Sequence, residues 1–136
     1  MRVLLTNDDG PPSVSSPFLV PFIQLLQDRL GWQVTVCIPH TQNSWMGKSF
    51  QIADTVSSTY LDPVTGIITN ERKDSNSWLL LSCTPAACVN IALHNVYSVS
   101  DFDLLLSGPN LGRNAGTGSS LSSGTMGYIN SHLALH

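Results

Sequence analysis

Short hydrophobic runs recur along the chain, and each run ends at residues that favour turns. The clearest runs lie at residues 3–5, 34–38, 78–82 and 101–108. Runs that are apolar at consecutive positions are typical of strands buried on both faces of a parallel sheet. The pattern therefore predicts four strands. The first two are separated by a helical stretch, which implies a parallel pair with a right-handed crossover.

An amphipathic stretch at residues 15–31 predicts a helix between the first two strands. Its apolar stripe is expected to consist of Phe18, Phe22, Ile23, Leu25, Leu26 and Leu30. Gly31 is a typical helix end. Pro21 predicts a late start for the regular helix, because a proline inside a helix removes a backbone hydrogen bond.

The remaining stretches complete a doubly wound α/β pattern. Residues 84–97 predict a second helix with Pro85 in its first turn, and residues 41–77 predict a small hairpin excursion. Residues 109–136 predict a Gly- and Ser-rich loop that leads into a last helical turn or two, and the position of residues 112–124 after a buried strand favours a binding loop over a linker. The sequence thus predicts an α/β fold with a mainly parallel sheet.

Composition and charge argue against long nucleic acid and membranes as partners. The 136 residues, 42% of them hydrophobic, are enough for one core. A net charge of −3 provides neither a basic stripe for long nucleic acid nor a polybasic membrane patch. Cys37, Cys83 and Cys88 show no CxxC spacing, which predicts buried thiols in a reducing compartment. With no signal-peptide core and no apolar run that spans a membrane, we expect a cytoplasmic protein.

Polar clusters follow three of the predicted strands, at residues 7–9, 41–44 and 107–110. In open parallel sheets, ligands bind beyond the carboxyl ends of the strands. A hard divalent cation, Mg²⁺ or Mn²⁺, would offset the repulsion between the adjacent carboxylates of Asp8 and Asp9, with a serine hydroxyl and an asparagine carbonyl as further oxygen ligands. An Asp-Gly turn explains the two aspartates equally well.

A further cluster predicts an anion site. Residues 122–125 (SSGT) present hydroxyl groups and a glycine where a helix is expected to begin, and the free N–H groups of a helix N-terminus bind phosphate. Ser and Thr also cap many helices, so the cluster is a weak signal by itself. Together with a carboxylate metal site, it indicates phosphoryl chemistry. Arg113 is either an added phosphate contact or a solvated loop cation.

One competing fold class also places paired acidic residues after its first strand, namely the receiver domains of response regulators. These domains need a phosphoacceptor aspartate after the third strand and a lysine after a later one. Here the corresponding strands end in Ser82-Cys83 and Ser107-Gly108, which argues against this class. The chain also lacks a Walker lysine loop, a GxSxG elbow and a glycine fingerprint after its first strand.

Four motifs, in their order along the chain, closely resemble the SurE-type phosphatases: LLTNDDGPP, TPAACVNIALHNVY, LLLSGPNLGRN and SSGTMG. The resemblance covers nearly the whole chain except residues 51–72, and two of the motifs are most similar to the fungal branch, often described as acid phosphatases. It implies a Rossmann-like, three-layer α/β/α core. It also implies one divalent ion, Mg²⁺ or Mn²⁺, and hydrolysis of nucleoside monophosphates or other small phosphate esters.

The resemblance further implies a set of site residues. The family's metal ligands correspond to Asp8, Asp9, Ser44 and Asn110, with Ser49 as an alternative to Ser44 in the same loop. Asp8 or Asp9 is also expected to orient or deprotonate the attacking water. The residues expected to hold the phosphate through hydroxyl groups and backbone amides are Asn7, Ser107, Gly108, Ser123, Gly124 and Thr125.

Two features depart from the family pattern. Cys83 stands where relatives usually have glycine, so we expect a local adjustment of packing. After SSGTMG the family continues with a helix and further strands that complete the sheet and the oligomer interface, whereas nine residues follow here. We therefore expect residues 1–136 to form a single SurE-like domain that is incomplete at its C-terminal end. The hypotheses are a metal-dependent phosphomonoesterase or a non-catalytic remnant that only binds a divalent metal or nucleotide.

Overall fold

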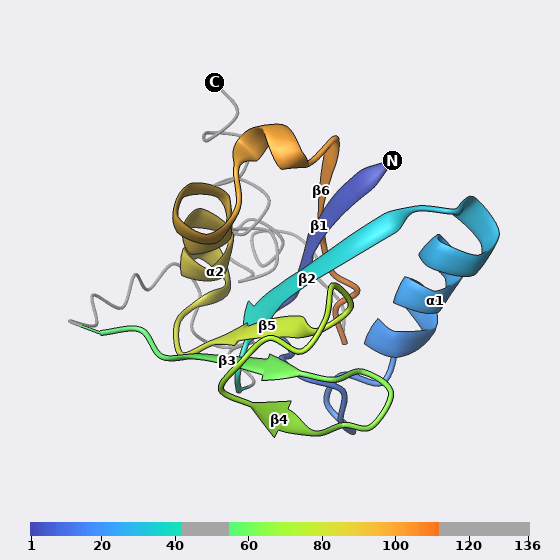
Figure 1. The fold of residues 1–136 in the computed structure, drawn as a ribbon. Helices are drawn as coiled ribbons and strands as arrows, with labels where there is room; N and C mark the ends of the chain where they lie inside the picture. Colours follow the sequence, from blue (N-terminus) through green and yellow to red (C-terminus); the bar gives the residue numbers. More distant parts are fainter. Residues whose placement is uncertain (42–54, 112–136) are drawn as a thin grey trace, which may run out of the picture.

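The computed structural model describes residues 1–41 and 55–111, which form a six-stranded mixed sheet (Figure 1). Its strands are β1 (Arg2–Thr6), β2 (Gln33–Pro39), β3 (Ser58–Leu61), β4 (Ile68–Thr69), β5 (Trp78–Leu81) and β6 (Leu104–Ser107). Their order across the sheet is β4-β3-β5-β2-β1-β6. The strands β5, β2, β1 and β6 pair in parallel, whereas β3 and β4 pair antiparallel. The four predicted strands are confirmed.

Helices cover both faces of this sheet (Figure 1). The helix α1 (Leu19–Leu30) follows β1, while α2 (Pro85–Ile91) follows β5 and continues into a π-helical segment (Ala92–Val96). Successive strand residues face opposite layers, since Leu4 packs in the cluster that contains α2 and Leu5 in the cluster that contains α1. Burial on both faces explains the continuous apolar runs, and the predicted α/β, Rossmann-like doubly wound fold is confirmed.

The first helix shows where the predicted stripe was wrong. The helix buries Leu19, Ile23 and Leu26. Three members of the predicted stripe, Phe18, Leu25 and Leu30, are instead 54%, 52% and 50% exposed. Apolar residues surround much of this helix, so spacing alone did not show which of them face the sheet.

The ends of α1 agree with the sequence. The helix starts late within the stretch 15–31, and Pro21 is its third residue, where a backbone N–H has no intrahelical partner in any case. Gly31 ends the helix in the left-handed conformation, with φ 64°. In the described parts of the chain, no helix is both long enough and apolar enough to cross a membrane.

The predicted hairpin excursion is confirmed for residues 55–77. Strands β3 and β4 are joined by a turn in which the Asp62 carboxylate accepts hydrogen bonds from the N–H groups of Val64 and Thr65, at 2.9 and 3.3 Å. β3 also pairs antiparallel with β5, so the hairpin extends the main sheet rather than standing apart from it. Residues 42–54 of the excursion lie outside the described residues.

Candidate metal and phosphate site

The pairing of β1 with β6 brings two of the predicted polar clusters together. The strands are parallel neighbours, and Thr6 is the register partner of Ser107. The N–H of Gly108 donates to the carbonyl oxygen of Thr6 at 2.8 Å, which extends the pairing by one residue. The residues that follow the two strands therefore leave the sheet side by side at its carboxyl edge, where open α/β folds bind ligands.

The turn after β1 is fixed by one buried amide. Asn7 is fully buried, and its Nδ2 donates to the carbonyl oxygen of Gly10 at 3.3 Å and to Oγ of Ser16 at 3.2 Å. Its Oδ1 accepts the N–H of Gly10 at 3.1 Å. Gly10 has φ 76°, a conformation that favours glycine. Asn7 thus braces the loop that carries the two aspartates, and its predicted role in phosphate binding stays a prediction.

Both aspartates are buried at this edge. Asp8 is 1% exposed and Asp9 is 3% exposed. Oδ2 of Asp9 accepts the backbone N–H of Leu111 at 2.7 Å, across 102 residues of sequence. This bond ties the loop after β1 to the loop after β6. Burying two adjacent carboxylates raises the free energy of the folded chain, and nearby positive charge offsets that cost.

The residue beside Leu111 supplies an oxygen with the properties of a metal ligand. Oδ1 of Asn110 is buried and has no hydrogen-bond partner among residues 1–41 and 55–111, and the same holds for Oγ1 of Thr6. A buried amide oxygen without a donor costs free energy that a bound cation recovers. Carboxylate and amide oxygens are the donor types that Mg²⁺ and Mn²⁺ prefer. The described residues therefore fit a hard divalent cation.

A cation at this edge depends on amide and hydroxyl oxygens as well as on acids. The described parts of the chain contain no group of three or more His, Cys, Asp or Glu residues that could hold a metal ion. Two carboxylates with an asparagine oxygen suit an ion that keeps several water ligands, as Mg²⁺ does. A closed Cys or His site of the zinc type does not fit these residues.

The structure brings together six of the predicted site residues at the ends of β1 and β6: Asn7, Asp8, Asp9, Ser107, Gly108 and Asn110. The other four, Ser44, Ser123, Gly124 and Thr125, lie outside the described residues, as does Arg113. The Gly108 N–H is donated to Thr6, and its φ of 125° suits glycine. Gly108 thus shapes the chain before Asn110, and its phosphate contact stays a prediction.

Sequence reasoning missed two contributors to the site. Ser16 holds the Asn7 amide from nine residues away, and the backbone N–H of Leu111 holds Asp9. Ser16 lies in a Ser- and Pro-rich stretch that is typical of an ordinary turn, so the sequence pattern did not indicate its contact with Asn7. A backbone N–H carries no side-chain signature at all, and its contact with Asp9 depends on the pairing of β1 with β6.

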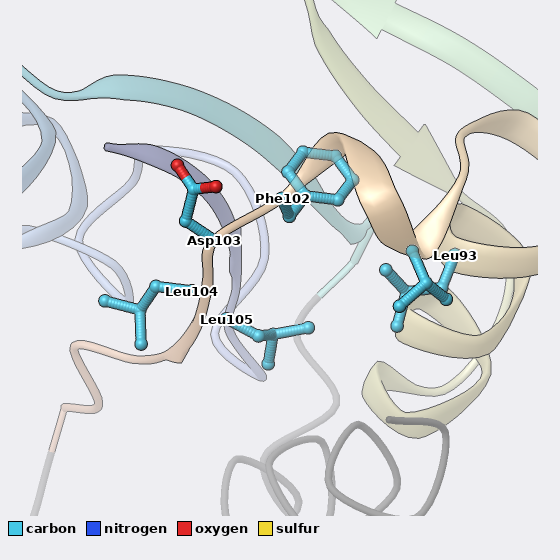
Figure 2. Close-up of a pocket in the computed structure, with 6 residues that line it drawn as sticks. Leu93, Phe102, Asp103, Leu104 and Leu105 are labelled. Carbon is cyan, nitrogen blue, oxygen red and sulfur yellow. The ribbon is translucent and has the colours of Figure 1, made fainter. Parts of the chain in front are cut away.

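A small apolar pocket elsewhere in the fold does not compete with this site. Figure 2 shows Leu93 and Leu105 pointing toward one another across a space also lined by Val99, Phe102, Asp103 and Leu104. Its volume is about 40 Å³. Sites for small-molecule ligands usually enclose about 300 Å³ or more, so this pocket holds no nucleotide.

Comparisons with known proteins bear on the family of this chain. The family described as "Survival protein SurE" matches residues 3–131. Over 154 aligned residues the chain is 40% identical to a Saccharomyces cerevisiae protein named "Probable tubulin--tyrosine ligase PBY1", with 93% of this chain and 20% of that protein covered. Over 117 residues it is 37% identical to the 5'-nucleotidase SurE of Rhodopirellula baltica, with 85% of this chain and 40% of that protein covered.

A solved structure shows the same fold. The SurE protein from Aquifex aeolicus matches with a TM-score of 0.68 at 24% identity, over 98% of this chain and 47% of that chain. The chain thus spans less than half the length of each of these relatives. The family match nevertheless covers nearly every residue present, including the loops after β1 and β6. The chain belongs to the SurE family.

Proposed function

We propose that the carboxyl edge of β1 and β6 binds one divalent cation, Mg²⁺ or Mn²⁺, and hydrolyses phosphate monoesters, with nucleoside monophosphates as the substrate class. One observation carries the proposal. Two buried carboxylates, Asp8 and Asp9, lie where the loop after β6 brings the buried amide oxygen of Asn110, and the 2.7 Å bond from Leu111 to Asp9 joins the two loops.

Each residue has a distinct part in this proposal. A divalent cation, when bound, supplies Lewis-acid activation of water and of a phosphoryl oxygen. Asp8, Asp9 and Asn110 hold it, with Ser44 as the predicted fourth ligand, and Asn7 keeps the aspartates in place through its bonds to Gly10 and Ser16. One of the two carboxylates orients the attacking water and accepts its proton.

Binding of the phosphate group falls to the remaining predicted residues. Hydroxyl groups and backbone amides of Ser107, Ser123, Gly124 and Thr125 are proposed to surround the phosphoryl oxygens, where negative charge spreads in the transition state. Ser107 is the last residue of β6 and lies three residues before Asn110, so it lies at the same edge as the proposed metal ligands.

The names of the relatives support hydrolysis of nucleotides. The Rhodopirellula baltica protein is named a 5'-nucleotidase, and the region matched to this chain is 40% of its length. The ligase name of the yeast relative describes a protein of which only 20% matches this chain. The buried thiols of Cys37, Cys83 and Cys88 support a reducing, cytoplasmic compartment as part of the proposal.

Phosphate release from a nucleoside monophosphate by the purified 136-residue chain, with and without Mn²⁺, tests the proposal. Asp8→Asn should abolish metal-dependent release, because it removes a charged ligand while keeping the size of the side chain. The matched control is Asp28→Asn on the exposed side of α1, which should leave release unchanged. A folded chain that binds Mn²⁺ through Asp8 but releases no phosphate would instead support the binding-only alternative.

A further inference from the structure

A cluster of three buried thiols lies on the α2 face of the sheet, apart from the proposed metal site. Cys37 and Cys88 are 0% exposed and Cys83 is 6% exposed. Sγ of Cys83 and Sγ of Cys88 are 3.5 Å apart. In contrast, Sγ of Cys37 donates to the carbonyl oxygen of Cys88 at 3.5 Å, which directs its hydrogen bond to the backbone. The thiols of Cys83 and Cys88 are thus in direct contact through their sulfur atoms.

The two close sulfurs occupy defined positions at the start of α2. Thr84 is the N-cap residue and accepts the N–H of Ala87. Cys83 directly precedes this cap, and Cys88 is the fourth helical residue. These positions normally carry two apolar side chains that pack together and set the angle at which the chain enters the helix. Here both are cysteines, so packing at the cap brings two thiols into contact.

The geometry needs only a small change to form a bond. A disulfide joins its sulfurs at about 2.05 Å, so the pair must close by roughly 1.5 Å, a movement within reach of a side-chain rotation. Cys83 lies between the end of β5 and the start of α2, so moving its side chain breaks no hydrogen bond within a strand or helix. Cys88 stays fixed on the helix, and the linkage closes a ring of six residues.

The two thiols differ in chemical character. The hydrogen bond from the Cys88 thiol lowers the pKa of Cys83, whereas burial raises the pKa of Cys88 well above its usual value. A thiolate is the form of cysteine that attacks an oxidant. Cys83, which is also the more exposed of the two, is therefore suited to react first, and Cys88 to react second.

We propose that Cys83 and Cys88 form a reversible disulfide when the protein meets hydrogen peroxide. The Cys83 thiolate attacks one peroxide oxygen, the O–O bond breaks, and the other oxygen leaves as hydroxide, which is protonated to water; Cys83 becomes a sulfenic acid. The Cys88 sulfur then attacks the Cys83 sulfur, the S–O bond breaks, and the hydroxide takes the Cys88 proton and leaves as water. Two thiols lose two electrons, and one peroxide becomes two waters.

The disulfide would form at the carboxyl edge of the sheet, where the proposed metal site also lies. β5 and β1 both run parallel to β2, so Cys83 follows β5 at the same edge of the sheet at which Asp8 follows β1. The disulfide would fix the junction between β5 and α2 at that edge. The inference does not depend on the proposed phosphatase activity, since it rests on the two sulfurs alone.

Thiol counting on the full 136-residue chain tests the proposal. The reduced protein is treated with hydrogen peroxide under native conditions, then denatured and alkylated, and its peptides are analysed by mass spectrometry. We expect the number of alkylated thiols to fall from three to one and to return to three after dithiothreitol. The peptide map should show a Cys83–Cys88 linkage.

Variants separate this pair from the other possible pairings. Cys37→Ala should still form the linkage and lose both of its remaining thiols. Cys88→Ala should stop at a Cys83 sulfenic acid that dimedone traps, and Cys83→Ala should keep both of its thiols. A Cys37–Cys88 linkage in the wild-type map, or three thiols retained in folded wild-type protein at a peroxide concentration that oxidises the denatured chain, would overturn the proposal. The wild-type map decides even if a variant fails to fold.

Discussion

The strand pair β1–β6 carries charged side chains at both of its ends, and the two ends are built in opposite ways. At the amino end, Nη2 of Arg2 contacts Oδ1 of Asp103 at 2.8 Å, with the two side chains 48% and 44% exposed. At the carboxyl end, Asp8 and Asp9 are neighbours of like charge and are 1% and 3% exposed.

The difference separates a structural contact from a candidate binding site. Exposed opposite charges lose little hydration on folding, and their pairing adds little to the free energy of unfolding. The contact between Arg2 and Asp103 therefore mainly joins the amino ends of β1 and β6. Two buried carboxylates of like charge reduce stability unless positive charge is supplied. A fold that keeps such a pair, together with the buried, unpartnered amide oxygen of Asn110 in the neighbouring loop, loses stability at this end, which is typical of a binding site.

The largest expected effect is stabilisation by metal at the carboxyl end alone. At a free Mn²⁺ concentration one hundred times its dissociation constant, binding to the folded state adds about 2.7 kcal/mol to the free energy of unfolding. Asp8→Asn should lose this gain. Asp103→Asn, at the other end of the same strands, should keep it. Thermal unfolding with and without Mn²⁺ measures both, and an equal gain in the Asp8→Asn variant would contradict the assignment.

The next effect concerns the amide that braces the aspartates. Asn7→Ala removes the three hydrogen bonds to Gly10 and Ser16 and leaves the buried N–H of Gly10 without its acceptor. We expect a loss of about 2 kcal/mol in the free energy of unfolding, measured in urea without metal. Asn95→Ala, an exposed asparagine after α2, serves as the control. Similar midpoints for the two variants would show that Asn7 does not hold the turn.

A smaller effect is expected at Gly108, where backbone conformation and metal binding can be measured separately. Gly108→Ala places a side chain at φ 125°, where L residues are strained, while the new Cβ meets the backbone nitrogen of Asn110 at 3.6 Å without a clash. We expect a loss of about 1–2 kcal/mol in stability together with weaker Mn²⁺ binding. Gly31→Ala, at φ 64° beyond α1, should lose stability alone. Calorimetric titration of both variants with Mn²⁺ tests whether Gly108 shapes the site through Asn110.

The smallest effect is expected at the exposed amino end. The hydrogen bond from the Arg2 guanidinium lowers the pKa of Asp103 to about 2. A carboxyl group whose pKa is lower in the folded state stabilises the fold above its unfolded pKa, and this contribution is lost as the pH falls toward 2. The stability curves of wild type and Asp103→Asn should therefore differ slightly at pH 7 and converge between about pH 4 and pH 2. A difference that persists at pH 2 would mean that the pair acts through packing.

Much of the fold followed from local pattern. Continuous apolar runs such as residues 78–82 predicted buried strands, because a strand covered on both faces has no polar side to mark it. The helix α1 was predicted with its end at Gly31, yet its buried face was not. Leu25 and Leu30 are apolar but half exposed, since the orientation of an apolar helix is set by what it packs against.

By itself, the sequence determined the strands, the α/β order and the chemical types of the site residues, because those depend on local periodicity and on which side chains can bind a hard cation. Only the tertiary structure decided which of these residues come into contact. The parallel register that pairs Thr6 with Ser107 lets the N–H of Leu111 donate to Asp9. The packing of α2 brings the sulfur of Cys83 into contact with that of Cys88. Contacts between residues far apart in sequence depend on register and packing, which no local pattern contains.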